Sequence, residues 1–221
     1  APSADLVVIH AFDAAGSSSY ATVIQGIDWV VANKDLYGIR VLNCSFSAEP
    51  QSYYFDDPLN QAIMEAWRSG IVVVASAGNR GPAAMTIGVP GNVPYIVTVG
   101  AMTDNFTPED QTDDILASFS SAGPTYEGFV KPEVVAPGGH VKGLMKNTAQ
   151  IAQDHPEFHD GGYYFNMSGT SQAAAFVSGT VALMLQHSPQ LTPDEVKYRL
   201  MASANRASFS GGSPVYSIFQ Q

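Results

Sequence analysis

Hydrophobic and polar positions along the chain form blocks that predict strands and helices in turn. Residues 17–32 and 58–69 place apolar side chains at helical spacing. Short runs that are apolar on both faces predict buried strands at 6–9, 40–46, 71–75 and 95–101. Strands that alternate with helices of about a dozen residues indicate right-handed crossovers. The predicted fold class is therefore α/β, with a parallel sheet covered by helices on both faces.

The longest apolar stretch, Tyr163–Gln186, carries hardly any charge and lacks the polar face of a surface helix. It predicts a buried helix with small side chains in its first half and large ones in its second. The residues Ser168-Gly169-Thr170-Ser171 predict a tight turn into the helix N-terminus, where free N–H groups and the helix dipole favour negative charge. Local sequence alone favours a hydroxyl here as an N-cap. A chemically active serine is the alternative.

The remaining stretches predict no second domain. Residues 102–160 combine acidic clusters with Gly-Pro turns, which is typical of loops and short strands. Thr192, followed by Pro193 and two acidic residues, predicts the start of a helix that runs to about Ser203. Because no internal repeat or linker marks a boundary, residues 1–221 are predicted to form a single domain.

Composition excludes several classes of function. A hydrophobic share of 45% with 14% charged residues is typical of a compact soluble protein, and no stretch is apolar enough to predict a membrane span. The net charge of −10 argues against nucleic acid or an anionic membrane as partner. The single Cys44 excludes an internal disulfide and leaves the compartment open. A start at Ala1 without a signal-like segment predicts a processed or truncated piece.

Three segments together resemble the subtilisin-like serine proteases, the subtilases. They are Ile71 to Asn79, Val134 to Gly138, and Gly169-Thr170-Ser171 at the start of the long helix, in the order and spacing of that family. Similar segments at 1–6, 118–124 and 191–196 extend the resemblance over nearly the whole chain. The resemblance implies a serine endopeptidase domain with the subtilisin-like sheet, of which this chain is the C-terminal two-thirds, without its N-terminal strands.

By this resemblance Ser171 is the nucleophile and Asn79 is the side-chain donor of the oxyanion hole. The chemistry of acyl transfer agrees with both roles. A serine hydroxyl needs a base to become a good nucleophile, and the oxyanion that it creates needs preorganised donors such as an amide and a helix N-terminal N–H. Asn79 also follows a predicted strand directly, and ligands of α/β sheets bind outside the carboxyl ends of the strands.

The chain departs from the family at two of the three triad residues. The resemblance places the catalytic Asp and His before Ala1, so neither motif is present. Of the five histidines, only His155 and His159 precede Ser171 in an acidic loop where a substitute base is conceivable. We favour the alternative that both are solvated loop histidines. Metal binding by His155, His159 and nearby carboxylates is as disfavoured as a role as the base. Ala175 and Phe176 replace a Pro and a His that are common in the family, which we expect to affect packing more than chemistry.

The resemblance also implies substrate and ion subsites. The walls of the primary specificity pocket would be Ser45, Phe46, Ser47, Ala77 and Gly78. Tyr20 and Val23 would form a more distant apolar subsite, and the Val89-Pro90 bond would be cis. No cofactor is required. The carbonyls of Gly91, Val93 and Ile96 would line a weak calcium or sodium site.

Three functions remain open from the sequence. The first is a subtilisin-type endopeptidase that acts on peptides or proteins, is secreted as is usual in the family, and receives its Asp and His from elsewhere. The second is a truncated relative with little or no activity. The third is a binding module that uses an exposed sheet edge. The strand at 6–9 would be that edge, and we expect it to recruit a second copy or a complementary N-terminal fragment.

Overall fold

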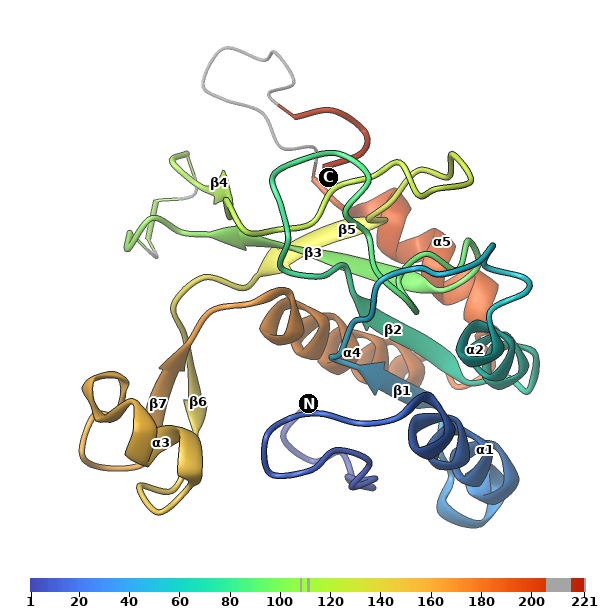
Figure 1. Cartoon of the computed structure of the whole chain (residues 1–221), viewed down its shortest axis with the longest axis horizontal. Helices are drawn as coiled ribbons and strands as arrows, with labels where there is room; N and C mark the ends of the chain where they lie inside the picture. Colours follow the sequence, from blue (N-terminus) through green and yellow to red (C-terminus); the bar gives the residue numbers. More distant parts are fainter. Residues whose placement is uncertain (108, 111, 206–215, 221) are drawn as a thin grey trace.

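The computed structural model describes residues 1–107, 109–110, 112–205 and 216–220 (Figure 1). Its centre is a parallel sheet in the order β1-β2-β3, with β5 beside β3 and the short β4 antiparallel to the end of β3. The bounds of these strands are Val41–Cys44 (β1), Val72–Ser76 (β2), Val97–Thr103 (β3), Ile115–Leu116 (β4) and Val134–Pro137 (β5). The predicted strands at 40–46, 71–75 and 95–101 correspond to β1, β2 and β3.

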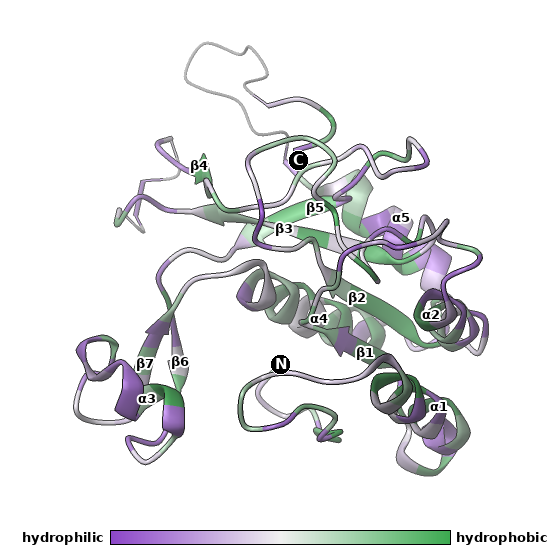
Figure 2. Ribbon diagram, in the orientation of Figure 1, coloured by the Kyte–Doolittle hydropathy of each residue, from purple (hydrophilic) through white to green (hydrophobic). Residues whose placement is uncertain are grey.

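Helices cover both faces of the sheet, as the continuous apolar runs predict. All five residues of β2 are buried, and Figure 2 shows hydrophobic residues concentrated in β2 and β3. The helix α4 packs across β1, β2, β3 and β5, whereas α2 and α5 contact β2 and α1 packs against α2. The helix bounds are Tyr20–Tyr37 (α1), Pro58–Arg68 (α2), Thr170–His187 (α4) and Pro193–Ser203 (α5).

Local signals define the ends of these helices. The side chain of Ser19 accepts the N–H of Thr22 at the start of α1, and Gly38 ends that helix in the left-handed conformation. Asp57 caps α2 in front of Pro58. The predicted start at Thr192 is confirmed, because Thr192 and Glu195 form a capping box.

The region between β5 and α4 forms an arm beside the sheet (Figure 1). The predicted loops and short strands of 102–160 are present, with the addition of a short helix. The arm contains the antiparallel strands Val141–Leu144 (β6) and Tyr164–Met167 (β7), the helix Gln150–Asp154 (α3) and the 3-10 turn Pro156–Phe158 (η1). Because β7 runs directly into α4, the arm is attached beside the start of the long helix.

Two sequence predictions about the core are wrong. Residues 6–9 form no strand, and Leu6 and Val8 are 85% and 82% exposed, because no strand lies beside them to pair with their backbone. The long helix starts at Thr170, as the turn at Gly169 predicts, but it is not buried on all sides, because Phe176 and Leu183 are exposed. The sheet edge is therefore β1, which pairs only with β2 in the described part of the chain.

No helix among the described residues is long and apolar enough to cross a membrane. The predicted cis bond between Val89 and Pro90 is confirmed.

Candidate active site

Ser171 lies in the first turn of α4, where the backbone N–H groups of the helix have no partner inside the helix. The N-cap is Gly169, and no side chain caps the helix. The interpretation of Ser168, Thr170 or Ser171 as an N-cap is therefore wrong. The Thr170 N–H donates instead to Asn79 Oδ1 at 2.9 Å, across 91 residues of sequence. Asn79, which follows β2, thus takes the place of a local side-chain cap.

Asn79 follows β2 at the carboxyl edge of the sheet, and its side-chain oxygen is held by two donors. Oδ1 accepts the N–H and the Oγ1 hydroxyl of Thr170, each at 2.9 Å. Thr170 Oγ1 accepts the Gly78 N–H at 3.2 Å, which links the two segments a third time. With Oδ1 occupied, the Nδ2 donor of Asn79 faces away from Thr170. Neither this Nδ2 nor the Ser171 N–H has an acceptor among the described residues.

The Ser171 hydroxyl donates to the Ser45 carbonyl at 3.1 Å, and the Ser45 hydroxyl donates back to the Ser171 carbonyl at 3.0 Å. This reciprocal pair fixes the start of α4 against the end of β1. A neutral peptide carbonyl cannot take the hydroxyl proton as a general base. In the described part of the chain, no general base thus lies within hydrogen-bonding distance of the Ser171 hydroxyl.

None of the histidines supplies that group. His155 and His159 lie in the arm, where the ring of His155 contacts Glu157 and the ring of His159 contacts the Met145 carbonyl and the Gly161 N–H. His140 stacks on Phe106 with ring centroids 3.9 Å apart. His187 ends α4, about 24 Å along the helix from Ser171 at 1.5 Å per residue. His10 is exposed in the N-terminal segment.

The predicted pocket walls follow β1 and β2 at the same edge of the sheet. The Phe46 carbonyl accepts a hydrogen bond from the Ser76 hydroxyl at 3.3 Å, and this bond joins the bases of the two walls. Gly78 has a φ of +106°, a conformation that disfavours any side chain, and it is buried beside Ser47 and Ser121. Cys44, which ends β1, is fully buried, and burial raises the pKa of its thiol to about 12, so it is no competing nucleophile.

The structure does not bring the predicted distant subsite to Ser171. Val23 is buried in the core on α1, with 7% of its surface exposed. The Tyr20 hydroxyl donates to Asp57 at 3.3 Å, and burial together with the Asp57 charge raises the pKa of Tyr20 to about 12. The role of Tyr20 and Val23 as a subsite stays a prediction.

A buried ion cluster lies at the predicted cation site. The Ile96 carbonyl accepts hydrogen bonds from the ammonium groups of Lys131 and Lys197, each at 3.1 Å. The Gly91 carbonyl accepts the Thr98 hydroxyl at 2.7 Å. Two ammonium groups thus share the Ile96 carbonyl, and the cation site at Gly91, Val93 and Ile96 stays a prediction. Val93 is buried in the same turn and has no role that the structure assigns.

Glu133 holds this ion cluster together. Its Oε1 accepts from Lys131 and Lys197 at 2.7 Å each, and its Oε2 accepts the Thr98 N–H at 2.8 Å. Burial, as the main cause, lowers the pKa of Lys131 to about 8. No signal in the sequence joins these three residues, because Lys131 and Glu133 lie just before β5 whereas Lys197 lies on α5. No group of three or more His, Cys, Asp or Glu side chains is placed to hold a metal ion in the described ranges.

Comparison with known proteins gives a consistent result. The model of the subtilase family matches residues 1–215. Serine protease AprX of Bacillus subtilis is 41% identical over 202 residues, which cover 89% of this chain and 46% of the relative. Subtilisin DY of Bacillus licheniformis is 32% identical and is covered to 62%, with 92% of this chain matched.

Solved structures show the same relationship. A cold-adapted subtilisin-like serine proteinase superposes with a TM-score of 0.66 at 29% identity, covering 90% of this chain and 60% of that one. Sphericase superposes with a TM-score of 0.69 at 24% identity, covering 86% and 57%. The chain thus spans about half to three-fifths of the length of these relatives. Because the subtilase family model matches residues 1–215, the chain belongs to the subtilase family of serine proteases.

Proposed function

We propose that this chain supplies the nucleophile and the oxyanion hole of a subtilisin-type endopeptidase. Ser171 attacks a peptide carbonyl, and the oxyanion accepts from Asn79 Nδ2 and the Ser171 N–H; water then hydrolyses the acyl-enzyme. One observation carries the proposal. Asn79 Nδ2 and the Ser171 N–H have no acceptor among the described residues, and three hydrogen bonds between 78–79 and Thr170 hold Asn79 against the turn that carries Ser171.

The Asp and His that activate Ser171 come, in this proposal, from polypeptide outside the chain. The described residues offer Ser171 Oγ only the Ser45 carbonyl. Substrates are peptides or proteins, and we place the action outside the cell, as the family resemblance implies. The alternative of a subtilase with little activity predicts the same fold with an unreactive Ser171, so reactivity of this serine separates the two.

Labelling of the full-length protein with a peptidyl phosphonate tests the proposal. We expect one adduct per molecule, located on Ser171 by peptide mapping, because phosphonates react only with an activated serine. Intact mass also reports any second fragment in the sample. Absence of an adduct, together with absence of peptide hydrolysis, would support the inactive alternative and overturn the proposal.

Asn79→Asp is expected to lower kcat strongly while KM changes little. The variant retains an Oδ1 acceptor for Thr170 but puts a second oxygen where Nδ2 donates to the oxyanion. The loss already measured for an oxyanion-hole asparagine in a subtilisin is about 10²–10³-fold in kcat, and we adopt this magnitude. Steady-state kinetics of Asn79→Asp and Asn79→Ala provide the check. A change below threefold in both variants would remove Asn79 from the oxyanion hole.

The edge of β1 supports a second element of the proposal, a partner strand. The Val72 N–H donates to the Arg40 carbonyl in the parallel pairing of β1 with β2. Because successive residues of a strand point their backbone groups to opposite sides, the N–H and C=O groups of Val41 and Asn43 point away from β2. Exposed apolar side chains flank this edge: Leu6 and Val8 in the N-terminal segment and Phe176 on α4. We propose that a strand of a complementary N-terminal fragment, or of a second copy, pairs with β1.

The chain expressed alone is expected to self-associate through this edge. Val41→Pro removes an outward N–H without removing a bond to β2, so it should shift the population towards monomer. Size-exclusion chromatography with light scattering over a range of concentrations measures the shift. A clean monomer of the unmodified chain at high concentration would contradict the partner strand.

A further inference from the structure

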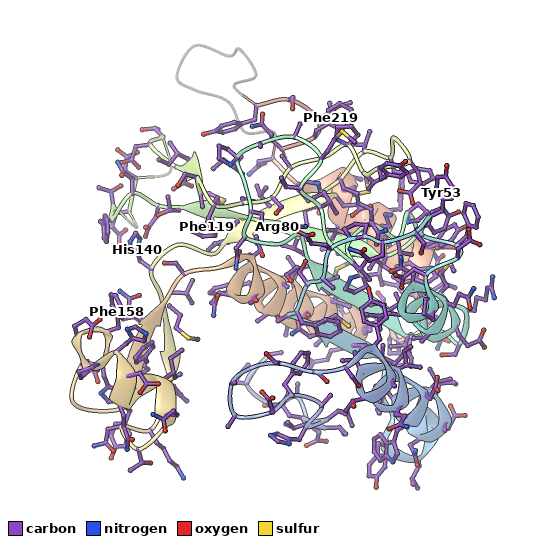
Figure 3. All side chains as sticks on the ribbon, in the orientation of Figure 1. Tyr53, Arg80, Phe119, His140, Phe158 and Phe219 are labelled. Atoms are coloured by element: carbon purple, nitrogen blue, oxygen red, sulfur yellow. The ribbon has the colours of Figure 1, made fainter. Side chains whose placement is uncertain are left out.

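A narrow slot lies beside Ser171 between two segments that follow β1 and β2. One wall is 45–49 and the other is 76–80. They are joined at the base by the Ser76 hydroxyl and the Phe46 carbonyl, and at the far end by the ion pair of Arg80 with Glu49. In Figure 3 Arg80 lies near the N-terminal end of α4. The two walls are thus linked at both ends of the slot.

The back of the slot is the segment around Gly88. Ala48 and Val89 exchange backbone hydrogen bonds at 2.9 Å, and the Gly88 N–H donates to the Ala77 carbonyl at 3.3 Å. Gly88 therefore touches both walls. Both Gly78 and Gly88 are buried, and the absence of their side chains leaves a space between them.

The side chain of Ser47 projects into that space. A Cβ added at Gly88 would collide with the Ser47 hydroxyl. A Cβ added at Gly78 would lie 3.4 Å from Ser47 Oγ and 2.9 Å from Ser121 Oγ. Ser47 is nevertheless exposed, so its hydroxyl faces the open side of the slot. The Ser47 hydroxyl thus occupies part of the floor of the slot, and the Ser121 hydroxyl lies at its border.

The geometry of attack directs one substrate side chain into this slot. Ser45, after β1, and Asn79, after β2, flank the start of α4. A substrate carbonyl that lies against Ser171 Oγ, with its oxygen at Asn79 Nδ2, therefore belongs to a residue that lies between the ends of these two strands. The side chain of that residue, on the acyl side of the scissile bond, then points between the walls. This step depends on the proposed function of Ser171.

We infer that Ser47 is the specificity-determining residue of this slot, and that it restricts cleavage to peptide bonds that follow small residues such as Gly, Ala and Ser. A large aromatic or aliphatic side chain would have to displace the Ser47 side chain and would remove the Ser47 hydroxyl from water without a hydrogen-bonding partner. The Arg80–Glu49 ion pair spans the two walls at the far end. A small side chain fits above the hydroxyls.

A pair of substitutions tests the inference in the full-length protein. Ser47→Gly lowers the floor, and Ser47→Thr raises it by one methyl group. Hydrolysis of peptides that differ only in Ala or Phe before the scissile bond gives the ratio of kcat/KM for the two residues. We expect Ala to be preferred and Ser47→Gly to move the Phe-to-Ala ratio upwards by about tenfold or more, the scale of pocket discrimination per small group. Ser47→Thr should move it downwards.

Peptides that end in Ala or Phe as free carboxylates add a readout independent of catalysis. Calorimetric titration should show tighter binding of the Ala peptide and a gain for the Phe peptide in Ser47→Gly. Ser52→Gly is the control, because Ser52 is an exposed serine whose hydroxyl contacts only the neighbouring Tyr53 carbonyl. It should leave both ratios unchanged.

The outcomes separate the two proposals. If Ser47→Gly shifts peptide binding but no variant hydrolyses peptides, the slot is correct as a binding site and the proposed endopeptidase is wrong. If hydrolysis depends on Ser171 while neither kcat/KM nor binding ratios respond to residue 47, the role of Ser47 is overturned. Faster cleavage after Phe than after Ala in the unmodified protein would also overturn it.

Discussion

Replacement of Ser171 by alanine is expected to abolish peptide hydrolysis by the full-length protein. The variant keeps the oxyanion donors, because the Asn79–Thr170 bonds do not involve the Ser171 side chain. It loses the hydroxyl that donates to the Ser45 carbonyl at the end of β1. Removal of the nucleophile from a subtilisin is known to lower kcat about 2 × 10⁶-fold, and we adopt a loss of this order here.

Ser168→Ala is the matched control for this prediction. Ser168 lies three residues earlier in the same turn, and its hydroxyl accepts the His140 N–H at 2.9 Å, on the side of the arm. We expect a modest change in kcat for this variant and undiminished phosphonate labelling. Retention of hydrolysis in Ser171→Ala, with labelling at another residue, would refute the assignment of the nucleophile.

The parts of the site that the sequence predicts are those with a strong local signal. The continuous apolar run of 71–75 predicts a buried strand, and the residues after it are therefore placed at the carboxyl edge of the sheet. The turn at Gly169 predicts the start of a helix in the same way. Resemblance then joins the two ends, and the structure brings Asn79 to within hydrogen-bonding distance of Thr170.

The parts that the sequence does not predict depend on partners far away in the chain. Thr170 and Ser171 carry the residue types of an N-cap, but Asn79 accepts the helix N–H and removes the need for one. Leu6 to Ile9 carry the composition of a strand, but a strand forms only beside a neighbour that pairs with its backbone. Local pattern describes what a segment can form, whereas long-range pairing decides what it does form.

The cation site shows the same limit with a chemical consequence. The carbonyl of Ile96 is a suitable metal ligand by type, yet Lys131 approaches it from 35 residues away. The approach of these ammonium groups cannot be read from the turn that carries the carbonyl. It is visible only where Glu133, Lys131 and Lys197 meet.

Glu133→Ala is expected to destabilise the protein more than any other single change in this cluster. Lys131 is fully buried and Lys197 is 18% exposed, and Glu133 is the only carboxylate paired with either ammonium group in the described residues. Loss of the shared partner leaves two cations close together with no countercharge. Breaking a buried ion pair from one side costs about 3–5 kcal/mol in the free energy of unfolding. Chemical denaturation at pH 7 measures this loss.

Lys131→Met is the matched variant, and it should be far milder, because Glu133 keeps Lys197 as its partner. It also isolates a pH effect. Burial lowers the pKa of Lys131 from 10.5 to about 8 in the folded state, so between these values the unfolded chain binds more protons than the folded one. The free energy of unfolding of the unmodified protein should therefore rise, relative to Lys131→Met, by about 3 kcal/mol between pH 8 and 10.5.

The comparison between these two proteins is necessary because other buried groups act in the opposite direction. Burial raises the pKa of Cys44 from 9.0 to about 12, so that ionisation of this thiol in the unfolded chain favours unfolding above pH 9. This contribution is common to both proteins and cancels in the difference. A difference that stays constant from pH 7 to 10.5 would show that Lys131 keeps an ordinary pKa. A loss below 1 kcal/mol in Glu133→Ala would show that the two ammonium groups need no shared carboxylate.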